Sequence, residues 1–513
     1  MDAQLATAPV TTGPAPAVPR ARTWPGSAVL WALGAITVAG AGARFASLGL
    51  QSFHHDEVIT VMRVIPGSFE EMLQRVRTSE SNPPLYYVLA WGWAKAFGTG
   101  EFGIRSLSAL AGAATVPVGY LIGAQLSSRR VGLILAALLA FNPMLVWYSQ
   151  EARSYALLIL FGALSLLFFL RALDRRGGRD LALWALASAA ALWSHYFAIF
   201  PVAIEAAWLI VALRGRLRQV APAVAAVGVA GAALLPLLAA QVNPNHIGWI
   251  DLSPLGYRFW QTGVSFLIGE TGRVIAEPPR DQYALVPAVL VLSGVLVLAV
   301  RGTRRERRGG LICLALGLGI AALAALAALA GHDYVLERNL LAALVPLAAA
   351  AALGFGASRA RRLGLVLAVA LCAYWAAFAV AVTQTPNLQR PDFRSLAARV
   401  GSPSAGRAVV SWRLAADPLH WYLRDGSRRM YGGSARVGEI DLIAKSKATS
   451  PPPRLPPSFR MTESVRLDRF TLSRYVSPRP VEVGFHSLRS LPTGFGAVGV
   501  LLDGPRPRAA VTR

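Results

Sequence analysis

The sequence predicts an all-α polytopic membrane protein that carries a small α/β domain at its C-terminal end. Of its 513 residues, 54% are hydrophobic and only 15% are charged, which is too apolar for a soluble globular protein. Eleven apolar runs are long enough to cross a bilayer as helices, which takes roughly 17 to 25 residues. From Thr383 onward the composition changes to charged residues, prolines and short β-like runs.

The predicted spans follow one another with short connections. They lie near residues 26–48, 104–126, 131–149, 154–172, 180–196, 197–213, 219–240, 283–300, 310–330, 339–356 and 361–382. A further apolar run, Pro84 to Phe97, has only 14 residues, opens on a proline pair and contains Lys95. We expect this run to be an interfacial or re-entrant helix rather than a span.

The basic residues predict the orientation in the membrane. With Pro84 to Phe97 at the surface, every arginine cluster between spans falls on one side, which is the pattern of cytoplasmic loops. The clusters are 129–130, 171–179, 214–218, 301–308 and 359–362. We therefore predict a multi-pass protein of the cell membrane with a disordered cytoplasmic segment at 1–25. The membrane domain would cover 26–383 with a long outer loop at 50–103, and an extracytoplasmic domain would cover 384–513.

Charge and cysteine content exclude two other classes of function. The net charge of +24 could indicate nucleic acid, but the basic residues stand in short clusters between apolar runs and in the tail, so no nucleic-acid partner is expected. The two cysteines, Cys313 and Cys372, both lie inside apolar runs. Neither a disulfide framework nor a thiolate metal site is supported.

The first polar stretch after a span is Ser52 to Glu57, which contains His55, Asp56 and Glu57. Charged groups at the depth where a chain leaves the membrane are costly and are typically kept for function. The alternative is a solvated loop that is merely polar. The outer loop continues with apolar residues at helical spacing over Val58 to Val76, so we expect an amphipathic helix there, broken near Pro66-Gly67.

Two later stretches place more carboxylates beside apolar runs. The first contains Glu80 and Asn82, and the second contains Glu151, Arg153 and Tyr155. Neighbouring helix ends can bring Asp56, Glu57, Glu80 and Glu151 into one cleft. A carboxylate in such a cleft suits a general base, while arginines can hold a phosphate leaving group. For Arg153, an ion pair with Glu151 is the structural alternative.

Three further residues are candidates at the outer ends of spans or within them. Arg338 opens the tenth span and can bind a phosphate or simply extend to the interface. His195 can orient substrate or bind metal, or it is a packed, hydrogen-bonded residue. Glu205 lies within a span, where a carboxylate is either functional or satisfied by an interior hydrogen bond.

The tail predicts a mixed domain. Short β-like runs occur at Ala408–Trp412, Phe470–Tyr475, Pro480–Gly484 and Ala497–Leu502, and Asp417 to Leu423 has a helical pattern. No Asp-x-Asp, His-Glu-x-x-His, Walker or dinucleotide motif stands in a suitable context. The sequence therefore identifies no cofactor, although it leaves a divalent cation open.

The order of these features resembles a known family. A long first span, the pair Asp56-Glu57, an interfacial helix, Pro83-Pro84-Leu85-Tyr86-Tyr87, and Phe97-Gly98 with Glu101 and Arg105 come before Gln150 to Leu157. This arrangement is similar to the family 39 type of polyprenyl-phosphate-dependent glycosyltransferases with the GT-C fold, which includes protein O-mannosyltransferases, lipid A aminoarabinose transferases and galacturonosyl transferases.

The resemblance implies an inverting glycosyltransferase that takes a sugar from a polyprenyl-phosphate donor on the outer face, with Asp56 as the catalytic base. From the residues themselves we predict that Glu57, Glu80 and Glu151 are supporting catalytic carboxylates. We also predict that substrate is bound by His55, Asn82, Arg153, Tyr155, His195 and Arg338, and that the acceptor is a glycan, a lipid or a protein. Glu80 stands three residues before Pro83, Asn82 stands where the family often has His or Lys, and Asn339 replaces a tyrosine after Arg338.

Two other functions are compatible with a polytopic chain. A lipid or polysaccharide transporter would favour repeated halves and broken helices at mid-membrane, and no internal repeat is seen. A membrane-tethered binding module would place its function in the tail, but it would not require eleven spans or Asp56.

Overall fold

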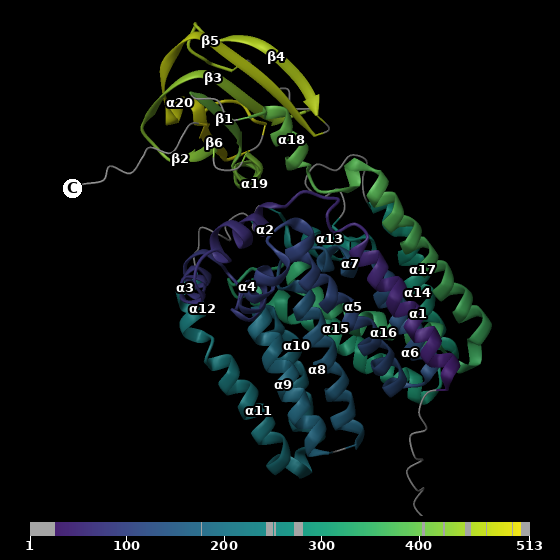
Figure 1. Ribbon diagram of the computed structural model, residues 1–513. Coiled ribbons are helices and arrows are strands. Elements are labelled where there is room, and N and C mark those ends of the chain that lie inside the picture. Colours follow the sequence, from purple (N-terminus) through teal and green to yellow (C-terminus); the bar gives the residue numbers. More distant parts are fainter. Residues whose placement is uncertain are drawn as a thin grey trace, which may run out of the picture.

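The computed structural model describes residues 26–175, 177–242, 250, 253–270, 281–402, 406–423, 426–446, 453–467, 469–494 and 496–503. The prediction of disorder at 1–25 lies outside these residues. The described chain forms a bundle of helices and a separate layer built on a six-stranded sheet, which lies beyond one end of the bundle (Figure 1).

The bundle is built from consecutive helices joined by short turns. In chain order these are α1 (Ser27–Phe45), α2 (His55–Ile59), the π-helical η1 (Thr60–Val64), α3 (Phe69–Ser79), α4 (Leu85–Phe97), α5 (Glu101–Leu126), α6 (Arg129–Phe141), α7 (Pro143–Ser149), α8 (Tyr155–Arg175), α9 (Gly178–Ser194), η2 (Tyr196–Ala198), α10 (Ile199–Ala212), η3 (Arg214–Arg216), α11 (Leu217–Ala232), α12 (Leu235–Gln241), α13 (Leu255–Ile268), α14 (Asp281–Arg301), α15 (Arg304–Leu329), η6 (Glu337–Ala343), α16 (Leu344–Phe355), η7 (Ser358–Ala360) and α17 (Arg361–Gln384).

Each of the eleven predicted apolar runs is helical along most of its length. Eight helical segments within the described residues are long and apolar enough to cross a membrane, and the bent pair α6 and α7, which meet at 57°, makes a ninth. The two remaining runs are shorter: α9 has 17 residues, and η2 with α10 forms the apolar segment Tyr196–Ala212. The prediction of a polytopic helical membrane protein is confirmed.

The loop after α1 folds as the sequence indicates. Its apolar run becomes α2, η1 and α3, and the break falls at Ile65 to Ser68, next to Pro66-Gly67. Ser68 caps α3, because its side chain accepts from the Glu71 N–H and Glu71 reaches back to the Ser68 N–H. The short apolar run Pro84 to Phe97 becomes α4, a helix of 13 residues that ends at Phe97 and is followed by the capping residue Gly98.

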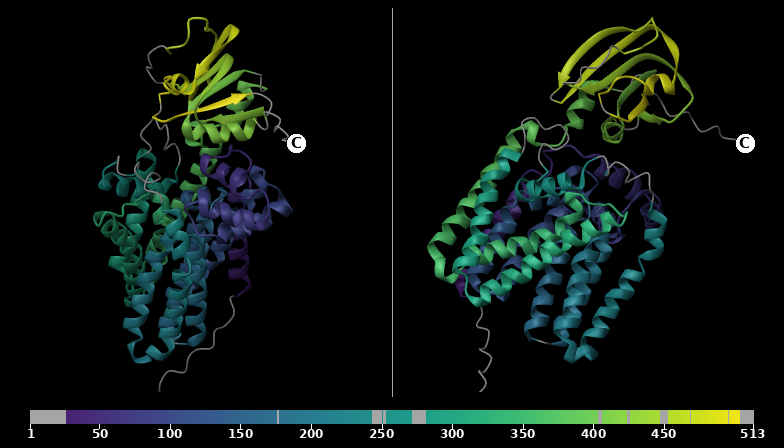
Figure 2. Two further views of the ribbon diagram at one scale, coloured as in Figure 1. Left: turned by 90° about the vertical axis from the view of Figure 1, so that its left-hand side faces the viewer. Right: turned by 180° about the vertical axis from the view of Figure 1, so that it is seen from behind.

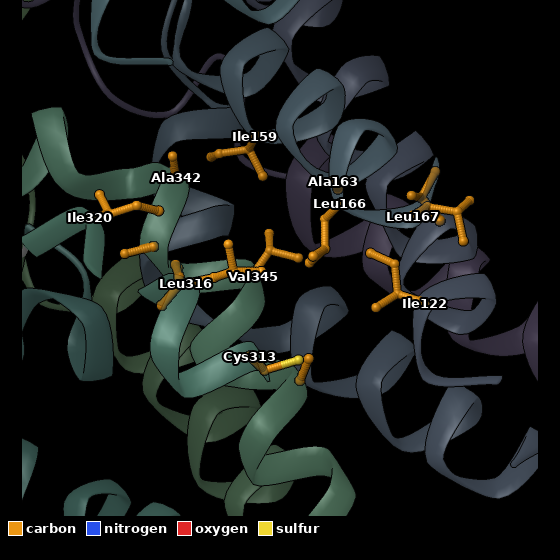
Figure 3. Close-up of a cluster of buried hydrophobic side chains, with 14 of the residues drawn as sticks. Ile122, Ile159, Ala163, Leu166, Leu167, Cys313, Leu316, Ile320, Ala342 and Val345 are labelled. Atoms are coloured by element: carbon orange, nitrogen blue, oxygen red, sulfur yellow. The ribbon is translucent and has the colours of Figure 1, made fainter. Parts of the chain in front are cut away.

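The interior of the bundle is packed with apolar side chains from helices that are distant in sequence. Figure 3 shows Ile122 of α5 and Leu166 of α8 near Leu316 of α15 and Val345 of α16. Small residues let some helices approach closely. A side chain at Gly123 of α5 would come within 2.8 Å of the Gly132 backbone on α6, so these two glycines allow the backbones to touch.

Several arginine clusters predicted to lie on one side of the membrane gather at one end of the bundle. Arg305 donates to the carbonyls of Leu126 and Gln125, at 3.2 and 3.3 Å, and Arg130 donates to the Arg361 carbonyl. These contacts join the start of α15 to the end of α5, and the start of α6 to the start of α17. The end of α8 and the start of α9 lie at the end of the bundle away from the sheet (Figure 1).

After α17, the chain passes through η8 (Pro386–Leu388) and α18 (Phe393–Val400) into the C-terminal domain. Its further elements are β1 (Arg407–Trp412), α19 (Arg413–Leu423), β2 (Ser427–Met430), β3 (Ser434–Lys445), β4 (Arg460–Leu467), β5 (Phe470–Gly484), α20 (Phe485–Arg489) and β6 (Val498–Asp503). The strand order is β2-β6-β1-β3-β5-β4, in which only β1 and β3 are parallel.

Successive side chains along each strand point to opposite faces of the sheet, and apolar side chains are buried on both faces. Val409 of β1 packs on one face with Leu419 of α19, whereas its neighbour Val410 packs on the other with Leu488 of α20. Three predicted runs become β1, β6 and β5, the last of which also takes in Pro480–Gly484, and the predicted helix becomes the end of α19. Strands β2, β3 and β4 were not predicted. Figure 2 shows that the domain stands over the end of the bundle that carries α2.

Candidate active site

A single short helix, α2, orients the two central carboxylates. It begins after His54, whose backbone N–H donates to Glu57 Oε2 at 3.0 Å, a reciprocal arrangement that fixes the first turn of a helix. This contact turns Glu57 into the protein. Asp56, one residue earlier, keeps a side chain that is 26% exposed.

Glu57 is fully buried and forms the centre of an ion-pair network. Arg105 of α5 donates to both of its oxygens, from Nε to Oε1 at 2.7 Å and from Nη2 to Oε2 at 2.8 Å. The Ala152 N–H donates to Oε1 at 2.9 Å. Burial opposes ionisation of Glu57, but Arg105 and then Arg390 outweigh it and lower its pKa. Its contacts make Glu57 an anchor for the segment that carries Asp56.

Asp56 faces a cation from a different part of the chain. Arg338, in η6, places Nη1 at 3.5 Å from Asp56 Oδ2, and the Arg338 side chain is 30% exposed. Burial disfavours the charged form of Asp56, yet the charge of Arg338, with smaller effects from His54 and Arg153, lowers the pKa of this carboxyl below its usual range. Asp56 is therefore an ionised, partly accessible carboxylate.

Arg153 and Glu80 form a second buried pair. Arg153 Nη1 donates to Glu80 Oε2 at 2.9 Å and to Glu80 Oε1 at 3.0 Å, and it also reaches Thr60 Oγ1 at 3.2 Å. The same nitrogen lies 3.4 Å from the Asp56 carbonyl oxygen. The pair thus ties the end of α3 to α2, and Arg153 pairs with Glu80 instead of with Glu151.

Glu151 takes its cation from the segment that leads into the C-terminal domain. Arg390 Nη2 donates to Glu151 Oε2 at 2.6 Å, its Nη1 donates to Glu57 Oε2 at 3.2 Å, and its guanidinium carbon lies 4.7 Å from the centre of the Trp147 ring. Burial raises the pKa of Glu151 to about 7, although Arg390 opposes this effect. Arg390 therefore joins two of the predicted site carboxylates.

An aromatic group lines the region beside these ion pairs. Tyr155 packs edge-on against Tyr148, with ring centres 4.6 Å apart, and His195 lies 5.4 Å from Tyr155. His195 is buried, and its Nδ1 accepts from the Phe197 N–H at 3.3 Å. These contacts match the alternative in which His195 is a packed, hydrogen-bonded residue. Tyr148 donates to Glu270, at the end of the described part of the 253–270 segment.

The other two substrate-binding candidates contact other segments of the chain. Asn82 is buried, and its backbone carbonyl accepts from Gln241 Nε2 at 3.1 Å. His55 faces the C-terminal domain, where its Nδ1 is 3.1 Å from Asp417 Oδ2. The mid-span Glu205 accepts from Trp184 Nε1 at 2.8 Å and from Ser165, as an interior hydrogen-bonding role predicts.

The C-terminal domain is docked directly on the loop that precedes α2. Ser52 Oγ donates to the Pro391 carbonyl and accepts from the Phe393 N–H, both at 3.0 Å. Tyr422 Oη accepts from the Phe53 N–H at 2.8 Å. The loop is therefore held on one side by the bundle and on the other by the domain.

In the described ranges, His, Cys, Asp and Glu side chains nowhere form a group of three that could hold a metal ion. The charges that face the carboxylates are guanidinium groups. Arg338 faces Asp56, Arg153 faces Glu80, and Arg390 faces both Glu57 and Glu151.

Sequence reasoning missed Arg390, and it reached Arg105 only through the family resemblance. Arg390 stands in Gln389-Arg390-Pro391, after α17 and the short η8. Arg390, like Asp56, carries a charge near the point where the chain leaves the membrane. Its two carboxylate partners lie 239 and 333 residues away in the chain, so only the fold could identify them.

These features define a polytopic helical membrane domain with a carboxylate and arginine site at one end, covered by a small sheet domain. The structure is similar to that of ArnT from Cupriavidus metallidurans bound to undecaprenyl phosphate, with a TM-score of 0.53 at 13% identity over 88% of this chain and 98% of that one. The apo form of the same protein gives a TM-score of 0.54 at 14% identity, over 78% and 85% of the two chains.

Residues 81–239 match the model of the dolichyl-phosphate-mannose-protein mannosyltransferase family. The oligosaccharyltransferase AglB from Archaeoglobus fulgidus, solved with an inhibitory peptide and a dolichol-phosphate, is 15% identical with a TM-score of 0.45 over 78% of this chain. The chain spans about 60% of the length of that enzyme. No curated protein matches the chain by sequence. The resemblance to GT-C glycosyltransferases is confirmed, and the membrane domain has the GT-C fold.

Proposed function

We propose that this protein is an inverting glycosyltransferase, which moves a sugar from a polyprenyl-phosphate donor to an acceptor on the extracytoplasmic side of the cell membrane. The observation that carries the proposal is the Asp56 and Arg338 pair. An ionised carboxylate and a guanidinium stand 3.5 Å apart, and both side chains are partly accessible. This pairing supplies a base for a hydroxyl group beside a cation for a phosphate.

In the proposed reaction, Asp56 and Arg338 each have one role. The acceptor oxygen forms a bond to the anomeric carbon of the sugar, and its proton passes to Asp56. The bond between the anomeric carbon and the phosphate oxygen breaks, and the electron pair leaves on the polyprenyl phosphate. Arg338 stabilises that phosphate, since a planar guanidinium can contact two of its oxygens.

Donor binding should also make Asp56 a better base. Arg338 has the strongest lowering effect on the pKa of Asp56. When a phosphate takes part of the guanidinium, its negative charge offsets the cation that Asp56 faces. The carboxylate then holds a proton more readily at the stage when the acceptor hydroxyl must lose one.

The other residues serve this centre by holding it in place. Glu57 is proposed to fix α2 through Arg105, and Arg153 with Glu80 to fix the backbone at Asp56. Tyr155 and His195 form the aromatic wall beside the site. Precise support of this kind matters because a displacement of about 1 Å can slow a reaction roughly a hundredfold.

The direct test is transfer by the purified full chain with a polyprenyl-phosphate sugar that accumulates in cells lacking the protein. Asp56→Asn should retain donor binding and lower turnover by roughly a hundredfold to ten-thousandfold, as expected for loss of a general base. Asp392→Asn is the matched control. Asp392 is exposed and caps α18, a position where Asn serves equally well. Normal turnover in Asp56→Asn would refute the proposed base.

A further inference from the structure

A cleft lies between the Asp56 segment and the C-terminal domain, outside the site described above. Its volume is about 350 Å³. One wall comes from η1 of the outer loop, and the other comes from α19, β2 and the turn after β2. The lining residues are Met62, Arg63, Asp417, His420, Ser427, Arg428, Arg429 and Tyr431.

The cleft has more positive than negative charge. Arg63, Arg428 and Arg429 contribute three guanidinium groups, and Asp417 contributes the one carboxylate of the lining. Arg63 Nη2 donates to Asp417 Oδ1 at 3.0 Å, and Arg429 contacts the same oxygen. Burial opposes ionisation of Asp417, but His55, Arg429 and Arg63 lower its pKa. The cleft lining therefore holds three guanidinium groups and one ionised carboxylate, which Arg63 and Arg429 contact.

The excess of positive charge in the cleft suits a negatively charged ligand. Arginine forks contact carboxylate or phosphate oxygens in pairs, and Arg428 is exposed, as is half of the Arg63 side chain at 45%. Tyr431, at the mouth of the cleft, is 75% exposed. A flat ring beside fixed polar groups is a common arrangement in sites for small ligands, and it offers a surface for a sugar ring.

The cleft is joined to the proposed catalytic centre by one polar side-chain contact. Asp417 Oδ2 lies 3.1 Å from His55 Nδ1, and His55 directly precedes Asp56. A saccharide held in the cleft can therefore extend along α2 to the base. Asp417 contacts His55, Arg63 and Arg429, whereas Asp56 pairs with Arg338, so the two groups of charges have different partners.

We propose that this cleft binds the acceptor through a carboxylate or phosphate on a sugar unit that does not react. The acceptor would then be an anionic glycan that both domains bind. The membrane domain would contact it through Arg63, and the C-terminal domain through Arg428 and Arg429. This inference rests on the proposed function for the identity of its ligand as an acceptor. The binding it predicts can be measured without any transfer reaction.

The test is calorimetric titration of the full chain in phosphatidylcholine nanodiscs with three probes. Glucose 6-phosphate and glucuronate should bind, and glucose should bind at least about tenfold more weakly, since hydrogen bonds between charged groups are stronger than neutral ones. The two anionic sugars also show whether phosphate or carboxylate is preferred. Equal binding of glucose and both anionic sugars would overturn the proposal.

The informative variant is Arg63→Gln with Arg428→Gln, which removes the excess charge and leaves Arg429 with Asp417. It should lose about tenfold or more in affinity for the anionic sugars. The control is Arg460→Gln with Arg466→Gln, because both residues are exposed on β4, at the opposite edge of the sheet from β2. Unchanged affinity in the first variant, or equal loss in the control, would refute the cleft as the site.

Two further measurements distinguish a glycan ligand from lipid headgroups and separate this proposal from the proposed base. Binding that occurs only in nanodiscs containing phosphatidylglycerol would show that the arginines meet lipid headgroups, and it would refute a glycan ligand. Asp56→Asn should bind glucose 6-phosphate like the wild type while transfer is lost. The proposed base and the proposed cleft can therefore fail separately.

Discussion

Arg390 offers the sharpest test of how the C-terminal segment takes part in the site. In Arg390→Ala, Glu151 loses a donor at 2.6 Å and Glu57 loses one at 3.2 Å. Glu57 keeps both bonds from Arg105, so the damage should centre on Glu151. Removing one partner of a buried ion pair costs roughly 3 to 5 kcal/mol.

Glu151 should limit that cost by taking up a proton. Its pKa is already about 7, and loss of a cation raises it further. Protonating a carboxyl costs about 1.4 kcal/mol for each unit by which the pH exceeds its pKa. At neutral pH this cost is small for Glu151, so the carboxyl can lose its charge when Arg390 is removed. We therefore expect the destabilisation to fall near the lower limit of the range above, at about 3 kcal/mol.

The loss of turnover should be larger than the loss of folding stability alone would cause. The reason is that Arg390 holds together the loops on both sides of Asp56. Arg390→Ala should lower kcat by about a hundredfold with little change in donor affinity. Arg390→Lys should fall in between, since one ammonium cannot replace two separately directed N–H groups. The assays are steady-state transfer and thermal unfolding in detergent.

Arg394→Ala is the matched control. Arg394 lies four residues later and pairs with Glu101 at 2.7 Å, but its side chain is 44% exposed, so its loss should cost at most about 1 kcal/mol. The double variant Arg390→Ala with Glu151→Gln should regain stability and not turnover, because it removes the uncompensated carboxylate without restoring the link. If Arg390→Ala behaves like Arg394→Ala in both assays, the proposed positioning role is refuted.

Three other predictions follow from the site and the fold. Because the pKa of Glu151 rises from 4.5 to about 7 on folding, the folded state binds the extra proton, and stability should decline as pH rises from 4.5 to 7; Glu151→Gln should flatten this slope in unfolding experiments. Arg338→Lys should weaken binding of the polyprenyl-phosphate donor and Arg338→Ala should weaken it further, whereas a role in helix anchoring alone predicts that Lys behaves like the wild type. A single cysteine at Ser127 should react only with membrane-permeant reagents and one at Ser464 with impermeant ones; external labelling at Ser127 would mean that α4 crosses the membrane.

The sequence alone determined which segments enter the membrane and which residues carry charge where they leave it. This follows because apolar runs of sufficient length and the charges between them are local properties, readable without knowing any long-range contact. Asp56, Glu80 and Glu151 were selected on this basis. The same local patterns found β1, β6 and the end of α19, where the alternation or the helical period is strong.

Tertiary structure decided which charges meet. Arg153 pairs with Glu80 rather than with its near neighbour Glu151, because the turn after α7 directs its side chain toward the end of α3. Strand β3 was missed although it is 12 residues long, since its charged residue Asp441 is buried against a distant partner, Arg474 on β5. Arg390 reaches Glu151 only because α17 returns the chain to the end of the bundle where α2 begins. Such pairings depend on the whole path of the chain, and no local pattern encodes them.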